Sequence, residues 1–438
     1  MATAPFHRRV LPWIFILAFL AVTPIVLFYT AGYRWDAKKG RIERNSTVIV
    51  DSTPKGAKIA IDGLLTTEVT PVTFETIDPG AHRFELSKGG YHNWEKTFDV
   101  RSDIVTFANQ VWLWKDAQPS LQVNTSATRI ALSPDGKNLL AFSREANITH
   151  ILFYSGSLQL STTSSIPTFL DPARDVEWSD SGRYALAYGL DQQPWLIDTS
   201  VAHAPLPLPN GLFRWEGARL VGNDGTDLVT IHPPQMDITR ETLTPGLIDK
   251  SDTIDLRTAT GTNHLVYVLA NDPTRGLVLP EGNWSLYSHV SDYALLRSAN
   301  SWLTLQDRSA TPEYHIANGT MLRELPPTSI FSLGSKPLQR YLVINRDELW
   351  AWEPHTDPQL LTRQSEPIVQ AAWHHEGNDI FYATKTGIYT LNTDPRDGYL
   401  VTQLASFDEV TDMAVNGGTV IVAGTKDGKS GIWTLLVE

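Results

Sequence analysis

The feature that most constrains the fold is a unit that recurs between residues 118 and 438. Each copy consists of an apolar strand, a polar turn, a second apolar strand and then an aromatic-rich third strand. The three clearest copies turn at Ser133–Gly136, Ser179–Gly182 and His374–Gly377. Fainter copies turn near Glu216-Gly217, Gly261–Asn263, Ser291-Asp292, Ser335-Lys336 and Asn416–Gly418. Repeats of this kind are stable only when neighbouring units bury one another's apolar faces.

The spacing of these turns indicates a β-propeller over residues 118–438. Successive turns lie 30 to 46 residues apart, close to the length of a four-stranded blade. Eight units predict eight blades, although the short step between Gly261 and Ser291 leaves seven blades open. The sequence ends on an apparent third strand, Ile432–Val437, and Ser120–Val123 can supply the missing outer strand. That pairing would close the ring and remove its exposed sheet edges.

A second feature is the apolar run Val10–Tyr33, which lies between Arg9 and Arg34 and contains no charged residue. As a helix it would be about 36 Å long, enough to cross a hydrocarbon core of about 30 Å with some tilt. The run is too long for the apolar core of a signal peptide and lacks a small-x-small cleavage site. A buried globular helix is rarely so long without a charge. We therefore expect residues 10–33 to form a single uncleaved transmembrane anchor.

The charges around this run bear on its orientation. Arg8 and Arg9 precede it, whereas five basic residues follow it within residues 34–46, so a positive-inside count alone favours a cytoplasmic body. A short head, residues 1–9, is nevertheless typical of a signal anchor. We expect the N-terminus to be cytoplasmic, residues 34–46 to form a basic juxtamembrane collar, and the bulk of the chain to be extracytoplasmic at the cell membrane.

Residues 47–100 alternate apolar and polar positions in runs of about five residues, the period of half-buried strands. Turn residues such as Asp62-Gly63 and Asp78–Gly80 separate the runs and provide the positive or preset φ that tight turns require. The pattern predicts strands at residues 48–50, 58–61, 72–74, 82–86 and 94–98, which would form a compact antiparallel β-sandwich. Residues 101–117 are then a connector or, through Val111–Trp114, the last strand of the sandwich.

The same segment carries a family resemblance. Five turn motifs occur in the order of the PEGA domain, with Lys55 where the family has Glu: Pro54-Lys55-Gly56-Ala57, Ile61-Asp62-Gly63, Thr70-Pro71, Pro79-Gly80-Ala81-His82 and Gly90-Tyr91 followed by Trp94. Ala31-Gly32-Tyr33-Arg34 after the apolar run is similar to membrane-anchored PEGA proteins. The resemblance implies an extracytoplasmic sandwich that serves as a spacer or interaction module in cell-envelope proteins, without catalytic residues. The Ser-Pro-Asp-Gly turn resembles those of bacterial periplasmic and WD-type propellers.

Composition excludes several classes of site and partner. The chain has no Cys, so it has no disulfides, thiolate metal sites or Cys nucleophiles. Residues 1–44 hold seven Lys and Arg against two acidic residues, whereas the remainder has a net charge of −17. A body this acidic is repelled by phosphate backbones, and we therefore expect no nucleic-acid partner.

Motifs for catalysis or cofactor binding are missing from the sequence, which has no Gly-x-Ser-x-Gly elbow, no His-Glu-x-x-His and no phosphate-binding Gly loop. The pair His374-His375 could contribute to a metal site, but it occupies a turn that is Ser-Pro-Asp-Gly elsewhere, which favours a solvated turn. Asn223–Asp227 resembles part of a calcium loop but lacks its later Glu, which favours a β-turn. Tyr91 and Trp94 could stack on a sugar ring, although in so small a sandwich we expect them in the core. We predict no catalytic, cofactor-binding or metal-binding residues and no cofactor.

Two classes of function fit these features, and a third is less favoured. The first is a non-catalytic, membrane-tethered interaction or scaffold protein of the bacterial cell envelope, held by residues 10–33 and contacting a protein or cell-wall partner through the propeller. The second is a glycan- or peptide-binding sensor, which predicts exposed aromatic side chains at one mouth of the ring. An enzyme such as a glycan hydrolase or lyase would need paired carboxylates about 5–10 Å apart across the axial pocket. We expect no enzymatic activity.

Overall fold

The computed structural model describes the chain from residue 6 onward, with gaps, and its contacts divide the chain into two units. Unit 1 comprises Met1–Asp116 together with Asp394–Leu400, and unit 2 comprises Ala117–Thr393 and Val401–Glu438. The residues after 6 that are not described are 31–32, 37–40, 45, 103, 146–147, 156–157, 171–175, 192, 201–203, 210–211, 217, 224–226, 234–236, 243–252, 259–264, 270–276, 279–292, 300–301, 308–313, 318–320, 326–329, 334–340 and 353–358.

The apolar run forms the α-helix α1, which spans Phe6–Thr30 and so begins and ends a few residues before the expected bounds. Between Trp13 and Leu27 the large apolar side chains that the structure describes are 48 to 67 % exposed. In the part of the chain that the structure describes, no helix has the length and apolar character needed to cross a membrane. Beyond α1, residues of the expected basic collar form a two-stranded antiparallel sheet of β1 (Tyr33–Asp36) and β2 (Arg41–Arg44).

The β-sandwich of unit 1 consists of two sheets, with strand orders β5-β4-β7-β8 and β6-β3-β9. Its strands are β3 (Ser46–Thr53), β4 (Lys58–Ile61), β5 (Leu64–Val69), β6 (Val72–Ile77), β7 (Gly80–Ser87), β8 (Trp94–Val100) and β9 (Val105–Trp112). All five expected strands are present. Asp62 and Gly63 both have positive φ and join β4 to β5, as the Asp-Gly signal predicts.

Two features of the sandwich differ from the expectation. The pairing of β3 with β9 is parallel, so the sandwich is not wholly antiparallel, and residues 105–112 supply its last strand, earlier than the expected Val111–Trp114. The edge strand β5 was not predicted. Its residues do not alternate, because all but Thr66 are exposed and Leu64 and Leu65 both face solvent.

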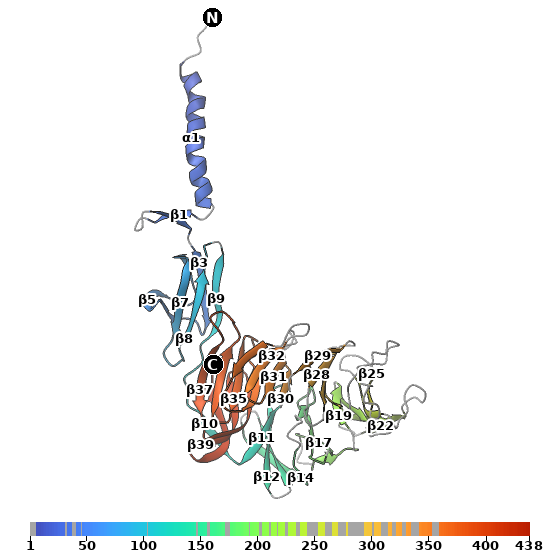
Figure 1. Cartoon of the computed structure of the whole chain (residues 1–438). Helices are drawn as coiled ribbons and strands as arrows, with labels where there is room; N and C mark the ends of the chain where they lie inside the picture. The colour runs from blue at the N-terminus through green and yellow to red at the C-terminus, as the bar shows by residue number, and fades with distance from the viewer. Residues whose placement is uncertain are drawn as a thin grey trace. The chain divides into compact units, whose positions relative to one another are not determined.

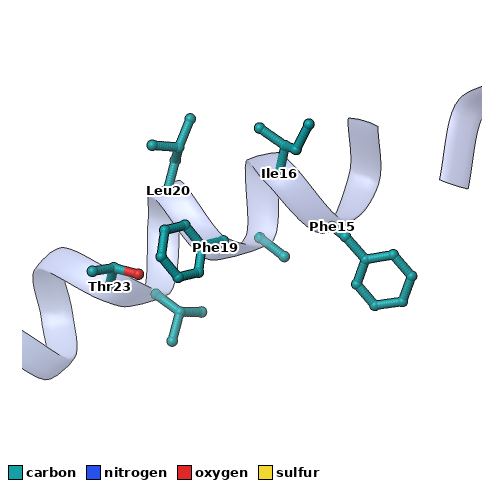
Figure 2. A pocket seen from close by; sticks show the side chains of 7 residues that line it. Phe15, Ile16, Phe19, Leu20 and Thr23 are labelled. Atoms are coloured by element: carbon teal, nitrogen blue, oxygen red, sulfur yellow. The ribbon is translucent and has the colours of Figure 1, made fainter. Parts of the chain in front are cut away.

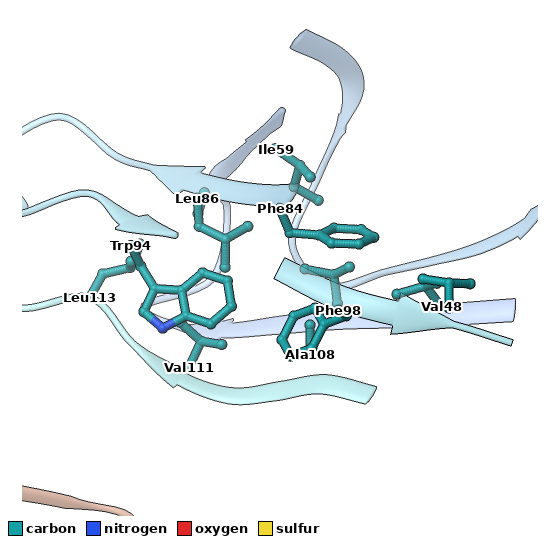
Figure 3. Close-up of a cluster of buried hydrophobic side chains, with 12 residues drawn as sticks. Val48, Ile59, Phe84, Leu86, Trp94, Phe98, Ala108, Val111 and Leu113 are labelled. Carbon is teal, nitrogen blue, oxygen red and sulfur yellow. The ribbon is translucent and has the colours of Figure 1, made fainter. Parts of the chain in front are cut away.

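The core of the sandwich is a cluster of buried side chains contributed by both sheets (Figure 3). Aromatic rings fill its centre: the ring centroid of Phe98 lies 5.8 Å from that of Phe84 and 6.1 Å from that of Trp94. Each such ring buries roughly 150–250 Å², which is a large contribution for so small a domain. The full cluster is Val48, Val50, Ala57, Ile59, Phe84, Leu86, Trp94, Phe98, Val100, Ala108, Val111 and Leu113.

Unit 2 is built of eight sheets in its described residues, seven with four strands and one with three (Figure 1). Each is an antiparallel meander of strands that are consecutive in the chain, apart from the sheet that contains the last strand, β40. This is the arrangement of propeller blades. The number of blades in the ring stays a prediction.

The first four of these sheets follow one another along the chain from Ala127 to Val278. They are β11 (Ala127–Leu132), β12 (Asn138–Glu145), β13 (Ile148–Ser155) and β14 (Leu160–Ile166); β15 (Glu177–Trp178), β16 (Tyr184–Tyr188), β17 (Pro194–Asp198) and β18 (Leu206–Pro207); β19 (Leu212–Glu216), β20 (Arg219–Asn223), β21 (Asp227–His232) and β22 (Asp237–Thr242); and β23 (Thr253–Thr258), β24 (Leu265–Leu269) and β25 (Leu277–Val278).

The second four sheets complete the unit. They are β26 (Tyr293–Ala299), β27 (Trp302–Asp307), β28 (Tyr314–Ala317) and β29 (Met321–Leu325); β30 (Ile330–Leu333), β31 (Tyr341–Asn345), β32 (Glu348–Trp352) and β33 (Gln359–Arg363); β34 (Ile368–Trp373), β35 (Asp379–Thr384), β36 (Gly387–Asn392) and β37 (Leu400–Ser406); and β38 (Glu409–Asn416), β39 (Thr419–Lys426) and β40 (Lys429–Leu436) with β10 (Ser120–Asn124).

The last sheet closes as the sequence predicts, because β10 pairs antiparallel with β40 and becomes its outer strand. The predicted turn at Ser291-Asp292 lies outside the described residues, so it stays a prediction. Strands β26 and β27 pair antiparallel, with Ala299 opposite Trp302.

Neighbouring sheets of unit 2 pack face to face through alternate side chains. In β12, Leu139 and Ala141 pack with buried side chains of β39 and β40, while Leu140 and Phe142 pack with those of β16 and β17. Side chains of β16 and β17 also pack against β19, β20 and β21. A strand buried on both faces accounts for the continuous apolar runs Leu139–Phe142 and Tyr184–Tyr188.

Candidate functional site

The repeated turns between the first two strands of a sheet share one backbone arrangement. In the three clearest copies the first turn residue accepts a hydrogen bond from the amide of a glycine three residues on, at 2.8–2.9 Å. The amide of that first residue donates to a carbonyl at the start of the next strand, also at 2.8–2.9 Å. Each glycine has positive φ, which accounts for its recurrence. The residues involved are Ser133, Gly136 and Asn138; Ser179, Gly182 and Tyr184; and His374, Gly377 and Asp379.

In two of these turns a serine hydroxyl completes the structure. Ser133 Oγ accepts a hydrogen bond from the amide of Asn138 at 2.9 Å, and Ser179 Oγ accepts one from the amide of Tyr184 at 3.1 Å. Ser133 also hydrogen-bonds to Asp135 at 2.7 Å. This hydroxyl and the amide of Lys137 hold the pKa of Asp135 below its ordinary value. Asp135 therefore stabilises the turn to which it belongs, as aspartate often does in turns.

Side-chain amides connect the turns of successive sheets. Asn416 Nδ2 donates to the carbonyl of Gly136 at 3.2 Å, and Asn138 Nδ2 donates to the carbonyl of Gly182 at 3.1 Å. Both bonds run in the same direction around unit 2. The first goes from the last sheet to the first sheet, and the second goes from the first sheet to the second. We call the turns at residues 133–138, 179–184, 374–379 and 416–419 the turn ring. Its polar groups hold neighbouring sheets in register.

His374 takes the place of the serine in its turn, and its surroundings differ from the sequence expectation. The turn is present, but His374 is fully buried while His375 is half-exposed, so only the second histidine is solvated. His374 Nε2 lies 2.8 Å from Glu438 Oε1. Amides of Val437 and Glu438 donate to the carbonyl of Gly418, which positions the Glu438 carboxylate beside the imidazole.

Two opposing effects act on the ionisation of His374. Burial lowers its pKa, and the hydrogen bond to Glu438 raises it; the positive charge that His375 can carry adds to the lowering. Burial prevails, so the pKa of His374 lies below its ordinary value of 6.5 and the ring is neutral at physiological pH. Among the described residues, His374, His375 and Glu438 form a group whose side-chain donor atoms could hold a metal ion, since these atoms lie within 4.8 Å of one another.

The other candidates from the sequence do not form a site. Trp94 is buried in the core of the sandwich and Tyr91 packs against it, as expected. In Asn223–Asp227, residues 224–226 lie outside the described residues, so the predicted turn there stays a prediction. Figure 2 shows a hollow on α1 lined by Phe15, Ile16, Phe19, Leu20 and Thr23. All its lining residues belong to one helix, and the hollow offers no converging polar groups that could orient a ligand.

Sequence reasoning missed a second polar centre, which lies in unit 1. Segment 394–400 is flanked in sequence by β36 and β37 yet belongs with the sandwich, where Leu400 packs on the core. Lys96, only 2 % exposed, donates from Nζ to the carbonyls of Asp394, Arg396 and Gly398 at 2.5, 3.1 and 3.1 Å. The signal was present: Lys96 shares the buried face of β8 with Trp94 and Phe98.

Comparison with known proteins agrees with this division of the chain. Residues 45–111 match the PEGA domain family. The match covers β3 to β8 and all of β9 except its last residue, in agreement with the resemblance seen in the turns. The chain thus combines a PEGA domain with a body of propeller-like sheets. A search of curated proteins found no match to the chain.

Solved structures that resemble the chain are β-propellers with low sequence identity. They include the Cps50 (Swd1) propeller domain of Myceliophteria thermophila (10 % identity, 72 % of this chain and 99 % of that chain, TM-score 0.42). The C-terminal WD40 domain of Sif2 has 13 % identity over 73 % of this chain and 98 % of its own, with a TM-score of 0.47. BamB from Moraxella catarrhalis has 12 % identity over 72 % of this chain and 100 % of its own, with a TM-score of 0.45.

Proposed function

We propose that the protein is a non-catalytic, membrane-tethered interaction scaffold of the bacterial cell envelope. In this proposal α1 anchors the chain with its N-terminus in the cytoplasm, the PEGA domain is an extracytoplasmic spacer, and the propeller presents a binding surface to a protein or cell-wall partner. A ring of packed sheets suits this role, because it offers a broad rigid surface without having to move.

The observation that carries the scaffold role is the use of polar groups in the turn ring. Asp135, Asn138 and Asn416 are the kinds of residue that enzymes use for chemistry, yet in this protein they bond to their own turn or to the next one. Groups so engaged stabilise the surface rather than act on a substrate. Exposed side chains of the turn ring, such as Lys137, remain accessible to a partner.

Support for the tether comes from the apolar run itself. Its charge-free stretch between Arg9 and Arg34 has enough residues to span a bilayer as a helix. The described large apolar side chains of α1 from Trp13 to Leu27 are about half or more exposed. Leaving so much apolar surface in water is costly, at about 25 cal/mol per Å². A lipid environment removes that cost.

Site-specific photo-crosslinking in living bacteria tests the scaffold role. A photoreactive residue replaces Lys137 in the turn ring of the full-length protein, and a matched variant carries it at Lys429. Lys429 begins β40 after the opposite turn of its sheet, so it samples the other end of the strands. We expect a discrete adduct with one envelope component at position 137 and none at 429. Absence of an adduct from both positions would count against the scaffold role.

A further inference from the structure

We propose that His374, His375 and Glu438 form a binding site for a divalent transition-metal ion, with zinc as the best match. The two histidines lie in the turn between β34 and β35, and Glu438 follows β40 in the neighbouring sheet. A metal ion held there would bridge two successive sheets of unit 2, one of which contains the closing pair β10 and β40.

The distances between donor atoms suit a small coordination sphere. Glu438 Oε1 lies 2.8 Å from His374 Nε2 and 3.7 Å from His375 Nδ1. Four-coordinate zinc with bonds of about 2.0–2.1 Å to nitrogen and oxygen places neighbouring ligand atoms about 3.4 Å apart. The two observed distances lie on either side of that value, and all three donor atoms lie within 4.8 Å of one another, so rotations of the side chains can bring them onto one ion.

The chemistry of the donors matches zinc better than magnesium or calcium. Two imidazoles and one carboxylate are the ligand types of three-residue zinc sites, whereas magnesium and calcium prefer oxygen ligands alone. His374 is buried and Glu438 is 24 % exposed, while half of His375 is in contact with solvent. Water can therefore reach the ion from the side of His375 and complete a tetrahedral sphere.

A further carboxylate stands where a supporting group is expected. Glu376 Oε1 lies 3.6 Å from His375 Nε2, the ring nitrogen that does not face Glu438. In many zinc sites a carboxylate accepts the second N–H of a ligating histidine, fixing the ring and raising its basicity. A rotation of the exposed Glu376 side chain would bring its carboxylate within hydrogen-bonding distance of His375.

The turn itself does not require a histidine. Ser133 and Ser179 occupy the equivalent position and complete their turns through their hydroxyl groups. His374 provides the same backbone hydrogen bonds but directs its ring toward Glu438. His374 thus replaces the serine and lies beside a second imidazole and a carboxylate from the next sheet. A metal ion would be coordinated by all three groups.

Zinc titration of the full-length protein in detergent tests the proposal. The protein is prepared without a histidine tag, treated with EDTA and titrated calorimetrically with zinc chloride at pH 7.5, because protons compete with the metal ion at lower pH. We expect one ion per chain at micromolar or tighter affinity, together with a rise in the thermal midpoint. His375→Ala and Glu438→Gln should weaken binding at least tenfold, and Glu376→Gln should weaken it to a smaller extent.

The control is His232→Ala, which removes an exposed histidine from β21 in another sheet and should bind zinc as the wild type does. Circular dichroism checks that each variant is folded, and His375 is preferred to His374 because its side chain is half in solvent. Wild-type protein that binds no zinc at this stoichiometry overturns the proposal. Equal affinity in wild type and in the His375→Ala, Glu438→Gln double variant does so as well, because the ion then sits elsewhere.

Discussion

At the scale of single residues, buried polar groups explain how segments distant in sequence are held together. Lys96 is the clearest case, because its ammonium group binds three carbonyls of segment 394–400. Two neighbours add to this arrangement: the amide of Thr97 donates to Asp397 at 2.7 Å, and the Arg396 guanidinium lies 4.5 Å from the ring centroid of Phe98. A buried ammonium is favourable only when its donors are satisfied, and the loop carbonyls satisfy them.

Lys96→Met should release segment 394–400 from the sandwich. Methionine retains the length and apolar stem of lysine but leaves the three carbonyls without their charged donor, a loss of about 2 kcal/mol or more. Hydrogen exchange of the full-length protein, followed by mass spectrometry, should show faster exchange of peptides covering 394–400. Lys58→Met, an exposed lysine on β4 of the same sheet, is the control and should leave exchange of the segment unchanged.

Hydrogen bonding of Asp198 makes a pH-dependent contribution to stability. Burial raises the pKa of Asp198, but bonds from the Arg183 guanidinium at 2.9 and 3.1 Å and from the amide and hydroxyl of Ser200 outweigh it. The pKa therefore lies below the ordinary value of 3.8. The stabilisation is complete above that value and is lost as the pH falls through the lower folded-state pKa.

Arg183→Gln should accordingly reduce the acid-dependent loss of stability. Denaturant unfolding of the full-length protein, repeated from pH 5 downward, measures the slope of the unfolding free energy against pH. The variant should have a shallower slope below about pH 4 than the wild type. Lys429→Gln, which removes a positive charge from another sheet, should retain the wild-type slope; the same shallow slope in both variants would show that net charge alone is responsible.

At the scale of elements, the pairing of β10 with β40 determines how the propeller sheets close. Gly431 of β40 lies opposite Asn124 of β10, and a Cβ added there would overlap the carbonyl oxygen of Val123 and the side chain of Leu121. Asp412 in β38 reinforces the same closure by accepting a hydrogen bond at 2.9 Å from the amide of Ile130 in β11. Backbone pairing thus adds β10 to the last sheet, and the buried carboxylate of Asp412 joins that sheet to the first one.

Gly431→Ala should weaken this closure. The added methyl group meets the backbone of Val123 as well as the side chain of Leu121, so β10 must move away from β40. Overpacking of this kind costs about 1–3 kcal/mol. A lower thermal midpoint and faster proteolytic cleavage around residues 117–126 are the expected results. Lys429→Ala changes an exposed position of the same strand. An equal effect of both substitutions would argue against the close approach at Gly431.

The repeats could be predicted from sequence because their signals are local. The Ser-Pro-Asp-Gly type of turn, the apolar strands beside it and the closing strand Ser120–Val123 are each contained in a few neighbouring residues. Segment 394–400 and the contact of Glu438 with His374 could not be predicted, because each joins residues that no periodicity relates. The edge strand β5 was not predicted, for a different reason. Its exposed leucines, Leu64 and Leu65, break the alternation that marks a half-buried strand.

At the scale of the whole molecule, the sequence separates into a basic, apolar N-terminal part and an acidic body of β-sheets. Residues 45–111 match the PEGA family, and unit 2 consists of consecutive sheets closed by β10. The central claim of the proposed function is that the apolar run tethers this body to the outer side of a membrane. The basic residues in 34–46 favour the opposite orientation, so a measurement of membrane topology is the strictest test of the proposal.

Protease accessibility in spheroplasts tests the tether and its orientation together. The full-length protein is expressed in a bacterium, the outer barriers are removed, and protease is added before or after lysis of the cell membrane. An antibody raised against residues 401–438 reports the body, and a cytoplasmic protein reports membrane integrity. We predict that the body is digested in intact spheroplasts while the cytoplasmic marker survives. A body that stays protected until the membrane is lysed would contradict the proposal.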